Sequence, residues 1–155
     1  MALGSNLGDR ARTLESALSA LSELPGARLL RRSTLLETAP ASPADGDAFL
    51  NAAALLETTL PPEALLGALH ELERAHGRER DPDRPHGGPR TLDLDLILFG
   101  ELELQTPGLE LPHPRFRARP FVLAPAAEVA PDLRDPVSGH TVAELLARLG
   151  SPAPR

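Results

Sequence analysis

Four leucines alternate with other residues between Leu92 and Leu98 of this 155-residue chain. A period of two is that of a β-strand with one buried face, so the alternation predicts a strand over residues 92–98 with its leucines in the core. Asp93 and Asp95 then project from the opposite face, roughly 6–7 Å apart along the strand. Two acids on one strand face are compatible with a divalent-metal site or with an ordinary solvated surface, and the strand alone favours neither.

A long arginine-rich loop precedes this strand. It runs from Arg78 to Arg90 and also contains Arg80 and Arg84. Loops of about 13 residues are uncommon in compact domains and are often functional. The arginines could simply pair with acids of the same loop in solvent, or they could bind phosphate through their planar forks. The neighbouring pair of aspartates favours the second interpretation, a polyphosphate bound together with Mg²⁺.

The composition excludes several classes of function. The chain has no lysine, so neither a P-loop nor the lysine site of a protein kinase is present. The absence of cysteine excludes disulfides, thiolate zinc sites and cysteine nucleophiles. A net charge of −6 argues against a general nucleic-acid binder. No signal-peptide pattern and no apolar run of membrane length occur, so we expect a soluble cytoplasmic protein.

Hydrophobic periodicity divides roughly the first hundred residues into six elements. It predicts strands over residues 1–4, 27–37, 49–59 and 92–98. It also predicts a helix from the N-cap Asp9 to the stop at Pro25-Gly26, and a second helix from Pro61-Pro62 to the C′ residue Gly77. The order βαββαβ indicates an α+β, ferredoxin-like fold. Two helices then cover one face of an antiparallel sheet, and the other face is open to ligands.

The remainder of the chain is expected to add a hairpin and helices to this core. A short strand is predicted near residues 102–104, a helix around 121–129, a turn at 135–139 and a final helix over 141–149. We expect a single domain over residues 1–150, followed by a frayed tail at 151–155.

Five isolated residues have both a structural and a functional interpretation. Phe49 and Phe121 are either core residues or plates that stack on a flat heterocycle, and Asn51 could hydrogen-bond such a ring. His113 lies between two prolines and close to several arginines, which suggests either a phosphate contact or a structural role. Glu73 opposes the dipole at the end of its helix, which indicates that it has a partner.

Four motifs then occur in order along the chain. They are Gly4-Ser5-Asn6-Leu7-Gly8, Phe49-Leu50-Asn51-Ala52, Gly88-Pro89-Arg90-Thr91-Leu92-Asp93-Leu94-Asp95 and Leu111-Pro112-His113. Together they resemble the 6-hydroxymethyl-7,8-dihydropterin pyrophosphokinase family of folate biosynthesis, from Leu3 to about Leu133. The resemblance implies a ferredoxin-like α+β fold. It also implies transfer of pyrophosphate from MgATP to the hydroxymethyl group of the pterin, with release of AMP.

The resemblance further implies roles for individual residues in a monomeric enzyme. Two Mg²⁺ ions, bound together with ATP, are expected on Asp93 and Asp95. The pterin-binding residues are expected to be Thr38, Ala39, Ala41, Phe49, Asn51, Asp93 and Phe121. The ATP-binding residues are expected to be Glu73, Arg78, Arg80, Leu96, His113 and Arg119. The catalytic residues are expected to be Arg80, Arg90 and Asp95.

The chain departs from the family pattern at two places beside the site. Gly87 stands where an aromatic residue normally precedes Gly-Pro-Arg, and Pro114 stands where an aromatic often follows the histidine. Two alternatives stay open: another Mg-dependent phosphotransferase, and a ferredoxin-like regulatory module that binds a small ligand without catalysis. The acid pair beside the arginine loop favours an enzyme, because a binding module needs neither.

Overall fold

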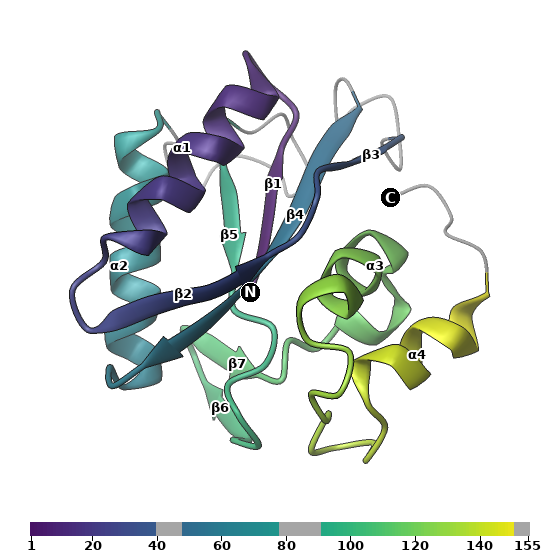
Figure 1. Ribbon diagram of the computed structural model, residues 1–155. Helices are drawn as coiled ribbons and strands as arrows, with labels where there is room; N and C mark the ends of the chain where they lie inside the picture. The colour runs from purple at the N-terminus through teal and green to yellow at the C-terminus, as the bar shows by residue number, and fades with distance from the viewer. Residues whose placement is uncertain (40–47, 78–90, 151–155) are drawn as a thin grey trace.

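The computed structural model, which describes residues 1–39, 48–77 and 91–150, is a mixed α+β structure built on an antiparallel sheet (Figure 1). The sheet has the order β2-β4-β1-β5, and β3 pairs with β4 beyond the end of β2. Its strands are β1 (Ala2–Ser5), β2 (Ala27–Arg32), β3 (Leu36–Thr38), β4 (Phe49–Thr58) and β5 (Asp93–Asp95). The helices are α1 (Arg10–Ser22), α2 (Pro62–Ala75), η2 (Phe116–Ala118), α3 (Pro120–Val129) and α4 (Val142–Leu149). The predicted ferredoxin-like arrangement is confirmed.

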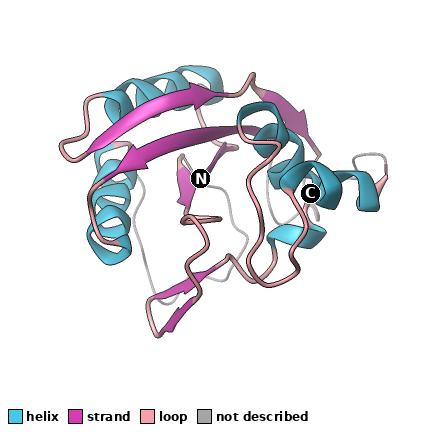
Figure 2. Ribbon diagram, turned by 60° about the horizontal axis from the view of Figure 1, so that its bottom comes forward, coloured by secondary structure: helices cyan, strands magenta, loops and turns pink. Residues whose placement is uncertain are grey.

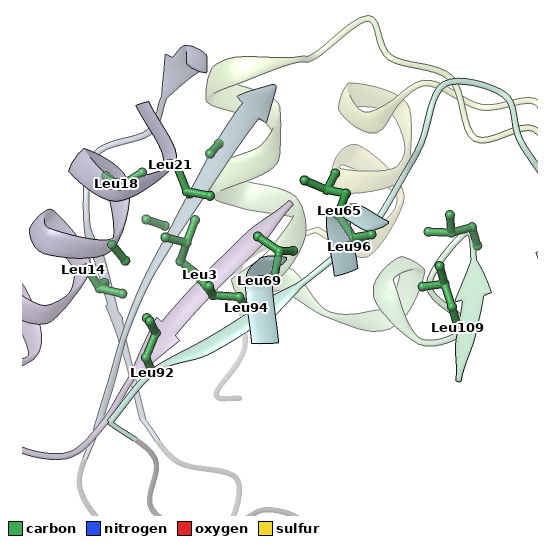
Figure 3. Packing of buried hydrophobic residues seen from close by; sticks show 14 residues of the cluster. Leu3, Leu14, Leu18, Leu21, Leu65, Leu69, Leu92, Leu94, Leu96 and Leu109 are labelled. Atoms are coloured by element: carbon green, nitrogen blue, oxygen red, sulfur yellow. The ribbon is translucent and has the colours of Figure 1, made fainter. Parts of the chain in front are cut away.

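Helices α1 and α2 cover one face of the sheet, as predicted. Leucines from both helices pack on Leu3 of β1 and Leu94 of β5 in a continuous core (Figure 3). Leu92 and Leu96 belong to the same core, so three of the four alternating leucines lie on the buried face as predicted, whereas Leu98 is half-buried against a second core. This orientation sends the side chains of Asp93 and Asp95 to the opposite face, because successive strand residues alternate between faces.

The ends of these two helices also follow the predicted signals. The Asp9 carboxylate accepts a hydrogen bond from the backbone N–H of Arg12 at 3.2 Å, which caps α1. Pro62 occupies the first position of α2, where no N–H donor is needed. Gly77 follows α2 with φ of +84°, a left-handed conformation that favours glycine.

The second face of the sheet is less open than predicted, because α3 packs on β4 and β1. Most of α3 is apolar and buried, so it needs cover on more than one side. Val122 and Leu123 of α3 join Phe116 and two residues of α4, Val142 and Leu145, in a second core. The expectation of a free face is therefore wrong over the area that α3 occupies.

Three predicted strands differ from the observed ones. The strand predicted over 27–37 is divided, because the Ser33 hydroxyl accepts the N–H of Ala53 (2.8 Å) in place of a strand carbonyl. The strand predicted over 92–98 is shorter in the structure, where only β5 (Asp93–Asp95) is formed. Its partner strand β1 begins with Ala2, and Ala2 pairs with Asp95.

The strand predicted near 102–104 is shifted to β6 (Leu104–Thr106). It forms a hairpin with β7 (Leu109–Leu111) that stands apart from the main sheet (Figure 2). The predicted helices around 121–129 and 141–149 and the turn at 135–139 are present. The loop predicted over residues 78–90 and the tail predicted at 151–155 lie outside the described residues, as do residues 40–47.

Candidate active site

A row of residues crosses three strands on the α3 side of the sheet. Gly4 in β1 lies opposite Asn51 in β4 on one side and opposite Asp93 in β5 on the other. Residues directly opposite each other share a face, so the Asn51 and Asp93 side chains lie on the same side of the sheet. Two strand spacings separate them by about 10 Å, and the glycine between them carries no side chain. The strand order therefore joins two predicted site residues that are far apart in sequence.

The second acid, Asp95, lies opposite Ala2, two positions further along the same face. Asp93 is buried and Asp95 is half-buried. Burial lowers the pKa of the Met1 amino group to about 6, and the charge of Asp95 opposes that shift. The Asp95 carboxylate is therefore close enough to the Met1 amino group for its charge to act on that group.

Asn51 is held rigidly on this face. Its amide nitrogen donates to the Leu36 carbonyl at 3.1 Å and to the Thr38 hydroxyl at 2.8 Å, and only 2 % of its surface is exposed. Phe49 shares the face of Asn51 because it lies two residues earlier in β4. Ala39 follows Thr38 and is exposed. The described residues of β3 and β4 that were predicted to bind the pterin thus lie next to one another.

Phe121 lies in the first turn of α3 and is buried against the second core. The guanidinium of Arg119, the N-cap residue of α3, lies 5.5 Å from the centre of the Phe121 ring, within cation–π range. An arginine of the predicted ATP side therefore contacts an aromatic of the predicted pterin side.

His113 is held by hydrogen bonds beside the segment that follows β5. Its backbone N–H donates to the Ile97 carbonyl at 2.9 Å, and its Nδ1 accepts the N–H of Arg115 at 3.1 Å. Burial, followed by the charges of Arg119 and Arg115, lowers the pKa of the His113 imidazole. The ring is therefore neutral at pH 7, and its accepting Nδ1 leaves the proton on Nε2 as a hydrogen-bond donor.

Glu73 has the partner that its unfavourable position in α2 indicates. Its carboxylate is buried and accepts the backbone N–H of Leu94 at 2.9 Å, between the two aspartates. Among the described strands β5 lies at the edge of the sheet, so this bond satisfies a donor that no described strand pairs with. Leu96, the other predicted ATP contact near β5, has its side chain in the first core. The contact of Glu73 with ATP stays a prediction.

A cavity of about 310 Å³ lies on the same side of the sheet, between β4, α3 and the segment after β5. Its lining is mainly apolar and includes Ala53, Leu96 and Val122, but neither Asn51 nor Asp93. Leu96 is the one described residue of the predicted site in this lining, so the cavity lies beside the Asn51–Gly4–Asp93 row and does not coincide with the predicted substrate site.

Several predicted site residues cannot be placed. Ala41, Arg78, Arg80 and Arg90 lie outside the described residues. Among the residues that the structure describes, no group of three or more acids and histidines is arranged to hold a metal ion. Asp93 and Asp95 therefore supply two oxygen-donating side chains, a number that suits Mg²⁺ when substrate phosphates provide further ligands.

Comparison with known protein families decides which of the open interpretations holds. Residues 1–131 match the model of the 7,8-dihydro-6-hydroxymethylpterin-pyrophosphokinase (HPPK) family. This chain belongs to the HPPK family. The match includes every residue predicted for the site, from Thr38 to Phe121.

Several curated relatives are also named as pyrophosphokinases. A 2-amino-4-hydroxy-6-hydroxymethyldihydropteridine pyrophosphokinase of Pseudomonas aeruginosa is 48 % identical over 147 residues, which is 95 % of this chain and 88 % of the relative. Proteins of that name from Methylorubrum extorquens and Bacillus subtilis are 42 % and 40 % identical. These alignments span 96 % and 83 % of this chain, and 91 % and 75 % of the respective relatives.

The sequence patterns did not indicate an ion pair between two further residues of the HPPK chain. Arg117 in η2 and Asp135 in the turn before α4 form a bidentate ion pair. Nothing in their local sequence indicates this pairing, because the partners come from separate segments and meet only through folding.

No helix in the described parts of the chain is both long and apolar enough to cross a membrane.

Proposed function

We propose that this protein transfers a pyrophosphoryl group from ATP to 6-hydroxymethyl-7,8-dihydropterin, giving the pterin diphosphate and AMP. Membership of the HPPK family supports the reaction. The observation that carries the proposal is the row Asn51–Gly4–Asp93, which places an amide suited to a heterocycle on the same sheet face as a pair of acids. A regulatory binding module would not need these acids.

The pterin is proposed to lie against Asn51, between the rings of Phe49 and Phe121. Asn51 offers a polar group whose position is set by Leu36 and Thr38. Flat aromatic rings bind heterocycles by stacking, and a fixed amide selects their orientation. The proposed pterin contacts are Thr38, Ala39, Ala41, Phe49, Asn51, Asp93 and Phe121.

ATP is proposed to lie on the side of β5 and His113. The neutral His113 ring has an Nε2–H donor suited to a phosphate oxygen, and Arg119 carries a full charge. The arginines of residues 78–90 would add further positive charge around the transferring phosphates. The proposed ATP contacts are Glu73, Arg78, Arg80, Leu96, His113 and Arg119.

Asp93 and Asp95 fit two Mg²⁺ ions because both present hard oxygen donors on one face. When bound, the ions would offset the negative charge that the two acids and the triphosphate bring together. We further propose that two Mg²⁺ ions bind, that the enzyme is a monomer and that it is located in the cytoplasm.

In the proposed reaction the pterin hydroxyl oxygen forms a bond to the β-phosphorus of ATP. The bond from that phosphorus to the oxygen shared with the α-phosphate breaks, AMP leaves, and the hydroxyl proton passes to solvent. The protein contributes mainly by positioning the two substrates and by offsetting charge. Arg80, Arg90 and Asp95 are proposed to act on the transferring group.

The identity of the nucleotide product tests this function. Incubation with ATP, Mg²⁺ and 6-hydroxymethyl-7,8-dihydropterin should give AMP and the pterin diphosphate in equal amounts, as measured by chromatography. Formation of ADP would indicate a different phosphotransferase. Binding of the pterin with no nucleotide product would indicate the regulatory module.

Replacing Asn51 with leucine should raise the KM for the pterin about 10- to 100-fold, with a smaller change in the KM for ATP. The substitution keeps the volume but removes an amide whose hydrogen bonds contribute about 1–3 kcal/mol. Steady-state kinetics with each substrate varied in turn measures the effect. Thr38→Val is the matched control, because it removes the hydroxyl that orients Asn51 and should give an intermediate KM. An equal rise for both substrates would contradict the assignment.

A further inference from the structure

Arg117 and Asp135 form the most completely bonded ion pair in the described part of the chain. Arg117 Nε donates to Asp135 Oδ2 at 2.6 Å, and Nη2 donates to Oδ1 at 2.9 Å. The Asp135 side chain is fully buried, whereas 29 % of the Arg117 side chain is exposed. The two parallel bonds set the angle of the guanidinium as well as its distance, which a single bond would not do.

The Asp135 carboxylate is held in place by hydrogen-bond donors of its own turn. Its carboxylate also accepts the Val137 N–H at 3.0 Å and the Ser138 hydroxyl at 2.6 Å. Arg117 and these donors hold the pKa of Asp135 well below its usual range, so the carboxylate stays charged at neutral pH. The turn itself is closed by the Asp135 N–H, which donates to the His140 carbonyl at 2.9 Å.

The segment that carries this turn is anchored independently of the sheet. Arg134 and Thr141 form an isolated β-bridge on either side of the turn. Thr141 caps α4 through a reciprocal pair of bonds with Glu144, and α4 packs on α3 and η2. Asp135 is therefore a fixed point to which another element can be attached.

Arg117, in contrast, lies in an element with little stability of its own. Helix η2 has three residues and connects His113 to Arg119. Its backbone bonds include Ala118 N–H to Arg115 O at 3.2 Å and Arg119 N–H to Phe116 O at 3.1 Å. Short 3₁₀ turns have poor hydrogen-bond geometry, so their position depends on side-chain anchors.

Two anchors hold η2 from different directions. Phe116 is fully buried in the second core, and the guanidinium of Arg117 lies 4.8 Å from the centre of its ring while it binds Asp135. Phe116 fixes the depth of the turn, and the planar Arg117–Asp135 pair fixes its rotation. The orientation of the turn sets the directions in which the chain leaves it, toward His113 on one side and toward Arg119 on the other.

We propose that Arg117 and Asp135 are positioning residues for the ATP side of the site, which set the relative placement of His113 and Arg119. This inference rests on the proposed function for the roles of those two residues. Asp135 lies beyond residue 131, where the match to the family model ends, so family membership assigns it no role. The turn before α4 thereby becomes part of the catalytic architecture.

The test uses two variants that alter the pair in different ways. Arg117→Lys keeps the charge and loses the planar fork, and Asp135→Asn keeps the shape and loses the charge. Misplacement of a binding group can lower rates by about 100-fold, so kcat/KM for ATP should fall about 10- to 100-fold in Asp135→Asn and less in Arg117→Lys. The KM for the pterin should change less than the KM for ATP. Arg148→Gln, an exposed change in α4, serves as the control and should match the parent.

A purely structural ion pair would behave differently. It would lower the melting temperature of both variants while the two KM values of the folded protein stayed as in the parent, and that result would overturn the proposal. If Asp135→Asn does not fold, Arg117→Lys provides the same comparison with both charges retained.

A readout independent of turnover separates this inference from the proposed function. The NMR signals of the His113 ring, assigned with His113→Gln, should move in both positioning variants and stay in place in the control. Unmoved His113 signals would contradict the positioning role even in an active enzyme. If the parent forms no AMP, the proposed reaction fails, while a displaced His113 would still support the structural link.

Discussion

Replacing Asp95 with alanine should lower the rate of AMP formation about 1,000-fold. The carboxylate lies two residues from Asp93 on the face of β5 opposite the first core, and the pair supplies the described side-chain oxygens proposed to bind Mg²⁺. Without Asp95 a bound Mg²⁺ would lose a ligand, and loss of a cationic group that offsets transition-state charge costs about 10²–10⁵ in rate in comparable sites. Single-turnover measurements of AMP at saturating ATP, pterin and Mg²⁺ would measure the effect.

Two further variants make this experiment specific. Asp95→Asn keeps the shape of the side chain and removes its charge, so it should lose nearly as much activity as Asp95→Ala. Glu101→Ala removes an exposed acid from the turn at residues 100–101. This variant should retain the activity of the parent. Near-normal turnover of Asp95→Ala would show that the acid pair does not belong to the active site.

Replacing Phe116 with alanine should lower the free energy of unfolding by about 3–5 kcal/mol. The ring is fully buried among residues of α3 and α4, including Val122 and Val142, and its removal leaves a cavity between them. The chain has neither tryptophan nor tyrosine, so urea unfolding is best followed by far-ultraviolet circular dichroism.

The size of the loss can be checked against milder substitutions. Phe116→Leu keeps most of the buried volume and should cost about 1 kcal/mol. Leu102→Ala, at a side chain that is 39 % exposed, should cost less than either. A loss below about 1 kcal/mol for Phe116→Ala would mean that the second core tolerates a cavity, and the anchoring of η2 by Phe116 would then be disproved.

Local signals predicted the elements that depend on neighbours in sequence. The N-cap at Asp9, the proline at the start of α2 and the glycine after it act within one helical turn, and the structure confirms all three. The alternation over Leu92–Leu96 predicted the face of Asp93 and Asp95 for the same reason, because strand geometry alternates side chains locally.

Features that depend on distant partners were predicted less well. The strand expected to reach Leu98 ends at Asp95 because its ladder depends on how far β1 extends beside it. The strand expected over 27–37 is divided because a serine hydroxyl substitutes for a strand carbonyl opposite Ala53. The face expected to be open is partly covered by α3, an outcome that depends on where a later helix packs.

The sequence by itself determined the ferredoxin-like order of elements, the acid pair and the family resemblance, because each is carried by local periodicity or by contiguous motifs. Only the tertiary structure decided that Asn51 and Asp93 flank Gly4, since that row depends on strand order. It alone joined Arg117 to Asp135, because hydrogen bonds between separate segments form only after both have been packed in place. The site thus combines locally encoded chemistry with positions that long-range packing supplies.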